Sequence, residues 1–265
     1  MSARVRVSAV SFLNARPLVH GLDRHPDLFE VSFDLPSTCA ARLHAGAVDL
    51  GLIPAIEYLN ADYRLVPGMA IGSDGPILSV AVFTTRPIDQ VRRIALDSSS
   101  RTSATLCRIL CARHWDIAPT FVPAAPRLEI MLREADAALV IGDPAFEIDP
   151  VKRGVTKIDL GAEWKSLTGL PFVYAMWVGR EGAASPAQCR ALQRARDNGL
   201  AHLGDIAREV AAGDATLERR SLEYLRDNLK YGLGPGEAAG LRRFHELSAE
   251  LGLVPELKPL RFYQS

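Results

Sequence analysis

The chain has 265 residues, of which 48% are hydrophobic and 23% are charged, so it can bury the core of one large domain or two small ones. Its 31 basic and 31 acidic residues give a formal net charge of zero, without the basic excess that is usual for nucleic-acid binders. No run reaches the roughly 18 apolar residues of a membrane span, and the first residues have no apolar signal segment. We therefore expect a cytoplasmic protein with neither a nucleic-acid nor a membrane partner.

Short apolar runs alternate with helical stretches from the start of the chain. Residues 5–13 predict a strand, 15–26 a helix and 29–35 a second strand. A helix capped by Ser37 or Thr38 then ends near Gly46, and residues 48–54 form a buried strand. This βαβαβ order predicts a parallel sheet with helices on both faces.

The alternation restarts further along the chain. Strands are predicted at residues 77–85, 92–99, 135–143 and 172–179, and helices at 100–115 and 127–135. From Pro186 onward the pattern is helical. Two units of this size, with crossings near residues 82–90 and 173–178, predict two lobes with a cleft between them. We expect residues 1–85 and 177–265 to form the first lobe and residues 86–176 the second.

Four cysteines, Cys39, Cys107, Cys111 and Cys189, are expected to be thiols in a cytoplasmic protein. Cys107, Cys111 and His114 share one helix face, which is a spacing that metal ligands use. Leu110 shares that face and no fourth ligand lies near in sequence, so packing in the core is the preferred interpretation.

The segment LDSSSRTSATL, residues 96–106, predicts an anion site from its residue types alone. A strand, a hydroxyl-rich turn and a helix leave free backbone N–H groups at the positive end of the helix dipole. The candidate substrate-binding residues here are Ser99, Ser100, Arg101, Thr102 and Ser103. The alternative is a well-capped helix with Arg101 in solvent or paired to an acid.

A weaker copy of that pattern occurs in LPSTCAARL, where Ser37 and Thr38 are the candidates. Each lobe would then bind one carboxylate of the ligand, which would couple closure of the lobes to binding.

Six segments in order give the chain a family resemblance: AVSFLNARPL, DLPSTCAARLHAGAVDLGLIPAIEYL, IGSDGPILSVAVFT, LDSSSRTSATL, EADAALVIGDPAF and WKSLTGLPFVYAMW. Together they resemble the chorismate dehydratases of the futalosine route to menaquinone, from about Val5 to Gly179. The resemblance implies an α/β fold similar to type II periplasmic binding proteins, with two lobes, mixed but mostly parallel sheets and a helical C-terminal tail. It also implies a lyase that removes water from chorismate to give 3-enolpyruvylbenzoate, with no cofactor and no metal.

In this family pattern Asn14 and Ser79 correspond to active-site residues, and Ser11 and Arg16 in the same turn as Asn14 are substrate-binding candidates. The amide of Asn14 can donate to a leaving hydroxyl or a carboxylate. Its alternative role is to cap a helix that begins at Ala15. Ser79 has no histidine at a recognisable spacing, so it is a hydrogen-bonding group rather than an activated nucleophile.

The strand end LVIGDPAF contributes Gly142 and Asp143 as further substrate-binding candidates. The related 1,4-dihydroxy-6-naphthoate synthases carry a histidine at the equivalent strand end, so the Gly-Asp pair favours the dehydratase. Asp143 is a candidate base, although an aspartate before Pro144 is also a common turn residue. The enolpyruvyl carboxylate of the substrate is the alternative base.

Several questions stay open at this point. Trp164, Phe172 and Tyr174 either wall the pocket or pack in the core. The alternative functions are the synthase, a binding protein that leaves its small ligand unchanged, and the effector domain of a transcriptional regulator. The oligomeric state, monomer or homodimer, is also open.

Overall fold

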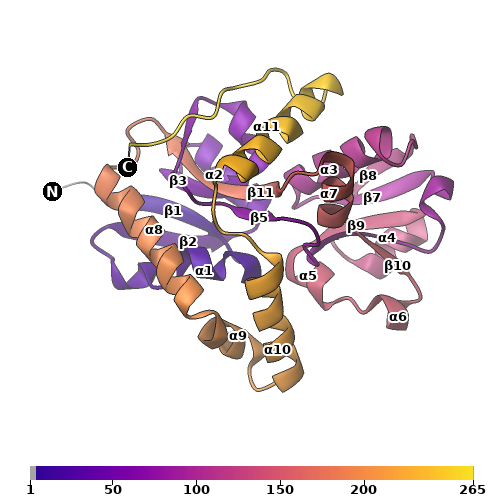
Figure 1. The fold of residues 1–265 in the computed structure, drawn as a ribbon, viewed down its shortest axis with the longest axis horizontal. Helices are drawn as coiled ribbons and strands as arrows, with labels where there is room; N and C mark the ends of the chain where they lie inside the picture. The colour runs from indigo at the N-terminus through magenta and orange to yellow at the C-terminus, as the bar shows by residue number, and fades with distance from the viewer. Residues whose placement is uncertain (1–3, 265) are drawn as a thin grey trace.

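The computed structural model describes residues 4–264, which form two β-sheets with helices packed on both (Figure 1). In the first sheet the spatial order is β2, β1, β3, β11 and β4, and β5 also pairs with β11. These strands are β1 (Val5–Val10), β2 (Phe29–Asp34), β3 (Leu50–Pro54), β4 (Tyr63–Leu65), β5 (Ile71–Ser73) and β11 (Phe172–Arg180). Strand β1 is parallel to β2 and β3, whereas β11 is antiparallel to its neighbours.

The second sheet has the order β10, β6, β9, β7 and β8. Its strands are β6 (Val80–Thr84), β7 (Arg93–Asp97), β8 (Thr120–Ala124), β9 (Ala137–Ile141) and β10 (Thr156–Asp159). Strand β7 is parallel to β8 and β9, and β6 is antiparallel to β9 and β10. Strands β3, β6 and β9 are buried along their whole length, as expected for strands covered on both faces.

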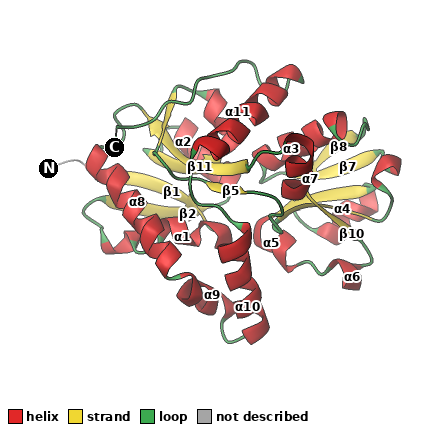
Figure 2. Cartoon of the chain, in the orientation of Figure 1, coloured by secondary structure: helices red, strands yellow, loops and turns green. Residues whose placement is uncertain are grey.

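Helices cover both sheets (Figure 2). They are α1 (Arg16–Val19), α2 (Pro36–His44), α3 (Arg101–Arg113), α4 (Leu128–Glu134), α5 (Gly142–Glu147), α6 (Pro150–Arg153), α7 (Leu160–Thr168), α8 (Pro186–Ala201), α9 (Leu203–Ala211), α10 (Ala215–Glu223) and α11 (Pro235–Glu250). Short 3-10 turns occur at Leu13–Ala15, Leu22–Arg24, Ala55–Asn60 and Ile88–Gln90, and a π-helical turn at Tyr224–Asn228. No helix within residues 4–264 is long and apolar enough to cross a membrane.

The α/β class with mixed sheets and a helical C-terminal part is confirmed, but the crossings between the sheets lie elsewhere than predicted. Strand β6 falls within the predicted first lobe, residues 1–85, yet it pairs in the second sheet. Most of β11 falls within the predicted second lobe, residues 86–176, yet it pairs in the first sheet. The chain therefore changes sheets before each of these strands rather than within or after them.

Two predicted helices also differ from the structure. The helix expected at residues 15–26 is broken into α1 and a 3-10 turn, because Gly21 adopts a left-handed φ of 78° between them. Helix α2 begins at Pro36, and its N-cap residue Leu35 makes no side-chain cap. The expected caps Ser37 and Thr38 are wrong, because proline at the first helical position starts the helix before them.

Candidate functional site

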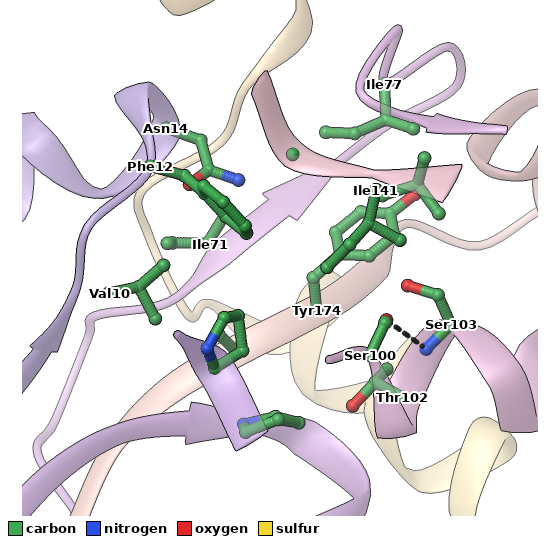
Figure 3. Close-up of a pocket in the computed structure, with 15 residues that line it drawn as sticks. Val10, Phe12, Asn14, Ile71, Ile77, Ser100, Thr102, Ser103, Ile141 and Tyr174 are labelled. Atoms are coloured by element: carbon green, nitrogen blue, oxygen red, sulfur yellow. Dashed lines mark hydrogen bonds between the residues drawn. The ribbon is translucent and has the colours of Figure 1, made fainter. Parts of the chain in front are cut away.

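A cavity lies at the boundary between the two sheets, where the ends of several strands meet (Figure 3). The centre of a water-sized sphere can reach about 50 Å³ of this space, so the cavity is narrow in this structure. Elements of the first sheet contribute Val10, Phe12, Asn14, Pro36, Pro54, Ile71, Tyr174 and Ala175 to its lining. Elements of the second contribute Ile77, Val80, Ser100, Thr102, Ser103, Ile141 and Gly142. Among these described lining residues none is charged.

Asn14 lies in the 3-10 turn that follows β1, and its side chain reaches the cavity (Figure 3). The turn is held across the boundary between the sheets, because the Leu13 N–H donates to the Asp143 carboxylate at 3.0 Å. Helix α1 has Ala15 at its N-cap position, so Asn14 does not cap it. The Asn14 Oδ1 atom is buried and has no hydrogen-bond partner among residues 4–264. A buried unpaired oxygen costs about 1–3 kcal/mol, which favours a role toward a bound molecule.

Ser79 lies behind the cavity wall, between the lining residues Ile77 and Val80 and outside the lining itself. It is 1% exposed, and the Tyr224 hydroxyl donates to its Oγ at 2.6 Å. Its carbonyl accepts the Gly142 N–H at 2.7 Å, which joins the start of β6 to another lining residue. Ser79 is thus fixed at the cavity by both its main chain and its side chain.

The turn before Ser79 has an uncommon backbone. Leu78 has a φ of 64°, which residues other than glycine seldom adopt. Asp159 accepts the N–H groups of Ile77 and Leu78, at 3.1 Å and 2.6 Å, and Lys157 donates to the Leu78 carbonyl. Neighbouring groups of β10 therefore hold the strained turn that delivers Ser79.

The start of α3 provides the hydroxyl groups on the other side of the cavity. Ser100 caps the helix by accepting the Ser103 N–H at 3.3 Å, and it also lines the cavity. The Thr102 Oγ1 atom accepts the Ile56 N–H at 3.2 Å. Because the first-turn N–H groups of a helix have no intrahelical carbonyl to bind, this end of α3 is a favourable place for a carboxylate.

Ser99 and Arg101, in the same segment, interact with acidic residues outside the cavity lining. Ser99 donates to the buried Asp97 carboxylate at 2.7 Å, and burial raises the pKa of Asp97. Arg101 pairs with Glu57 at 2.9 Å, so its alternative role, pairing with an acid, is the one that the structure contains. Neither residue lies in the cavity lining.

Gly142 lines the cavity and has a φ of 66°, and the ring of Phe12 lies 2.6 Å from where a Cβ atom would be. No side chain fits at this position without displacing Phe12. Asp143 lies outside the lining, where its carboxylate accepts the Leu13 N–H and burial raises its pKa.

The remaining candidates lie away from the cavity. Ser11 and Arg16 line a separate outer pocket, where Arg16 pairs with Glu209 at 2.9 Å. Ser37 is half-buried and Thr38 is exposed in the first turn of α2, where Pro36 is the residue that reaches the cavity.

The structure also shows which aromatic candidates line the cavity and where the candidate metal ligands Cys107, Cys111 and His114 lie. Tyr174 lines the cavity, whereas Trp164 and Phe172 pack edge to face in the core with ring centres 5.1 Å apart. Cys107 and Cys111 are buried, and His114 lies 3.0 Å from Glu163. Within residues 4–264 no cluster of three or more histidine, cysteine or acidic residues could hold a metal ion.

Tyr224 is the site-adjacent residue that sequence reasoning missed. It lies on the π-helical turn at Tyr224–Asn228, 1% exposed, and contacts Ser79 from 145 residues further along the chain. Burial raises its pKa, and the nearby Ser79 and Asn14 side chains partly oppose that shift. Interrupted α-helices of this kind are common at functional sites, but no pattern in a single sequence marks them.

Comparison with known proteins identifies the family of this chain. The family model described as menaquinone biosynthesis matches residues 5–250. The chain belongs to this menaquinone-biosynthesis family.

Members and structural neighbours give further detail. The chorismate dehydratase of Thermus thermophilus is 28% identical over 260 residues, which cover 87% of this chain and 95% of that protein. Protein AF1704 from Archaeoglobus fulgidus has a TM-score of 0.72 at 17% identity, covering 96% of this chain and 99% of that one. The periplasmic aliphatic sulphonate binding protein SsuA from Escherichia coli has a TM-score of 0.62 at 17% identity, covering 100% and 95%. The fold is therefore that of the periplasmic binding proteins.

Proposed function

We propose that this protein is a chorismate dehydratase, a hydro-lyase that converts chorismate to 3-[(1-carboxyvinyl)oxy]benzoate and water. The observation that carries the proposal is the match to the Thermus thermophilus enzyme of that name, which spans 95% of the relative's length. Membership of the menaquinone-biosynthesis family agrees with this reaction.

The reaction makes modest demands on the catalytic groups of the protein. A ring hydroxyl leaves from one carbon, a proton leaves from the neighbouring carbon that carries the enolpyruvyl ether, and the two depart together as water. The ring becomes aromatic, so the driving force lies in the substrate. The protein must mainly hold two carboxylates, favour departure of the hydroxyl and exclude bulk water.

The cavity supplies groups of the required kinds. The start of α3, with Ser100, Thr102 and Ser103, can hold a carboxylate through N–H groups and hydroxyls. The Asn14 amide lines the cavity, where its NH2 group can donate to the oxygen of the leaving hydroxyl and its unpaired Oδ1 can accept a proton from the substrate. Apolar walls exclude water and strengthen both interactions.

The base in this proposal is the enolpyruvyl carboxylate of the substrate. None of the described lining residues carries a charge, and the Asp143 carboxylate is occupied by the Leu13 N–H. The substrate's own carboxylate lies close to the ether-bearing carbon and can take its proton without a protein group.

The two lobes are part of the proposal as well. The first sheet carries Asn14 and the second carries Ser79 and the start of α3, so the site is complete only when both are close. We expect free protein to open at the crossings before β6 and β11 and to close over the ligand.

The proposal is tested by mixing purified protein with chorismate and following mass and ultraviolet absorbance. We expect a product lighter by one water, with the absorbance of an aryl ether. Chorismate that is retained unchanged would instead indicate a binding protein. Turnover of a different menaquinone intermediate, with chorismate untouched, would indicate the synthase.

A further inference from the structure

We propose that Tyr224 is a positioning residue for the dehydration, which orients the Ser79 hydroxyl so that Ser79 donates its own proton into the cavity. The inference rests on the proposed function and adds to it a residue from the C-terminal part of the chain.

The hydrogen bond itself carries the first step. The Tyr224 hydroxyl lies 2.6 Å from Ser79 Oγ, and each residue is 1% exposed. A phenol has one proton, and in this bond it is donated to Ser79. Within residues 4–264 the Ser79 side chain has no other hydrogen-bond partner, so the serine proton remains free to donate. Ser79 lies directly behind the wall formed by Ile77 and Val80, and the proposal assigns an oxygen of the bound ligand as the acceptor of its proton once the lobes rearrange around that ligand.

The second step concerns the group on the other side of the tyrosine. The Asn14 side chain lies close enough to the phenol to lower the pKa of Tyr224, so Tyr224 stands between Asn14 and Ser79. The hydrogen bond that Tyr224 donates to Ser79 polarises the serine hydroxyl and makes it a stronger donor. The two groups proposed to act on the leaving hydroxyl are thus joined through one buried phenol.

The third step is the way in which Tyr224 is held. Its ring stacks on Phe146 of α5 with centroids 4.7 Å apart. Arg220 donates to the Phe146 carbonyl at 2.9 Å and lies 5.0 Å from the centre of the Phe146 ring. Tyr224 belongs to the C-terminal helices and Phe146 to the second sheet's elements, so the hydroxyl is placed by packing that spans both.

Tyr231 is a matched control a few residues further along. It is also buried, at 4% exposed, but its hydroxyl has no hydrogen-bond partner among residues 4–264. Removing the Tyr231 hydroxyl changes the same kind of side chain in the same segment without touching Ser79.

The experiment compares Tyr224→Phe, Tyr231→Phe, Ser79→Ala and the Ser79→Ala/Tyr224→Phe double variant in steady-state turnover of chorismate. We expect Tyr224→Phe to lower kcat about tenfold, the size of one neutral hydrogen bond, with KM within about twofold. Tyr231→Phe should retain both constants. In the Ser79→Ala background, Tyr224→Phe should cause no further loss, because its target is gone.

Wild-type kcat in a folded Tyr224→Phe protein would overturn the inference, and so would independent, multiplying losses in the double variant. If Tyr224→Phe does not fold, 3-fluorotyrosine at position 224 keeps the shape but makes the phenol a stronger donor. It should raise kcat severalfold, whereas an unchanged kcat overturns the inference. A wild-type protein that leaves chorismate intact overturns the proposed function and this inference together, whereas loss of the inference alone leaves wild-type turnover in place.

Discussion

The Asn14 turn and the start of α3 lie on opposite sides of one cavity but satisfy their polar groups in different ways (Figure 3). At the α3 start, Ser100 accepts from the Ser103 N–H and Thr102 accepts from the Ile56 N–H. At the Asn14 turn, the Oδ1 atom is buried with no partner within residues 4–264. The α3 side is complete without a ligand, and the Asn14 side is not.

The difference separates two tasks. At the α3 start the hydroxyls already form hydrogen bonds within the protein, so the backbone N–H groups are left to bind the ligand. These N–H groups should bind the carboxylate of the substrate equally well in the ground state and in the transition state. A side chain left unpaired at a cost in stability can be aimed at one reacting atom. We therefore expect substitutions at Asn14 to act on kcat and substitutions at the α3 start to act on KM.

Asn14→Asp should have the largest effect. It keeps the shape but replaces a donating amide at the cavity wall with a negative charge beside a dianion. We expect kcat to fall roughly 10²–10³-fold, the cost of one well-placed donor. Steady-state kinetics on protein whose folding is verified by circular dichroism checks this. A folded variant near the wild-type rate would reduce the Asn14 turn to a structural element.

Ser79→Ala should follow, with a loss of roughly tenfold to a hundredfold in kcat. The serine lies behind the wall and contributes one hydroxyl, whereas Asn14 contributes a whole amide. If both groups hold the same oxygen, the double variant with Asn14→Asp should lose less than the product of the single losses. Losses that multiply in full would show that the two residues act on different atoms.

Thr102→Val should act on binding. It removes the hydroxyl of a residue that lines the cavity and leaves the buried Ile56 N–H without its acceptor, at a cost of about 1–3 kcal/mol in stability. We expect KM to rise about tenfold with kcat nearly unchanged. A fall in kcat at constant KM would remove the distinction between the two sides of the cavity.

Arg101→Ala should change KM less than Thr102→Val does. Its guanidinium is engaged by Glu57, whose side chain is only 4% exposed. Glu57 keeps His44 and Asn60 as partners, so we expect a loss of stability of about 1 kcal/mol rather than the 3–5 kcal/mol of a fully buried pair. Thermal unfolding measures this, and a KM raised a hundredfold would instead place Arg101 on the substrate.

Ser37→Ala and Thr38→Ala should have the smallest effect. Both lie in the first turn of α2, and Pro36 is the residue of that turn that lines the cavity. We expect kcat and KM to stay within about twofold of the wild-type values. A large rise in KM for either variant would instead show that this residue binds the second carboxylate, as the sequence suggests.

The two helix starts show what could be predicted from sequence. The segment 96–106 was predicted to bind an anion, with a well-capped helix as the alternative, and Ser100 is the residue that caps the helix. Ser37 and Thr38 fit the same pattern, but Pro36 starts the helix earlier and turns their hydroxyls away from the cap position. A shift of two or three residues in a helix start is below what composition and periodicity can resolve.

Longer-range contacts could not be predicted at all. The partners of Ser79 and Arg101 are Tyr224 and Glu57, each distant in sequence and unmarked by any motif. The short strands β4, β5 and β10 were missed because three or four residues are too few to show a period. By contrast, the long buried strands β3, β6, β9 and β11 were predicted from their apolar runs, and with them the fold class.

Chorismate carrying deuterium on the ether-bearing ring carbon tests the central claim most directly. If the cavity removes the ring hydroxyl together with the proton of that carbon, the aromatic product contains no deuterium and its mass is that of chorismate less one molecule of HDO. The wild-type protein should convert the labelled substrate in this way, and Asn14→Asp should do so far more slowly. An aryl product that keeps its deuterium, or labelled chorismate recovered unchanged, would contradict the account.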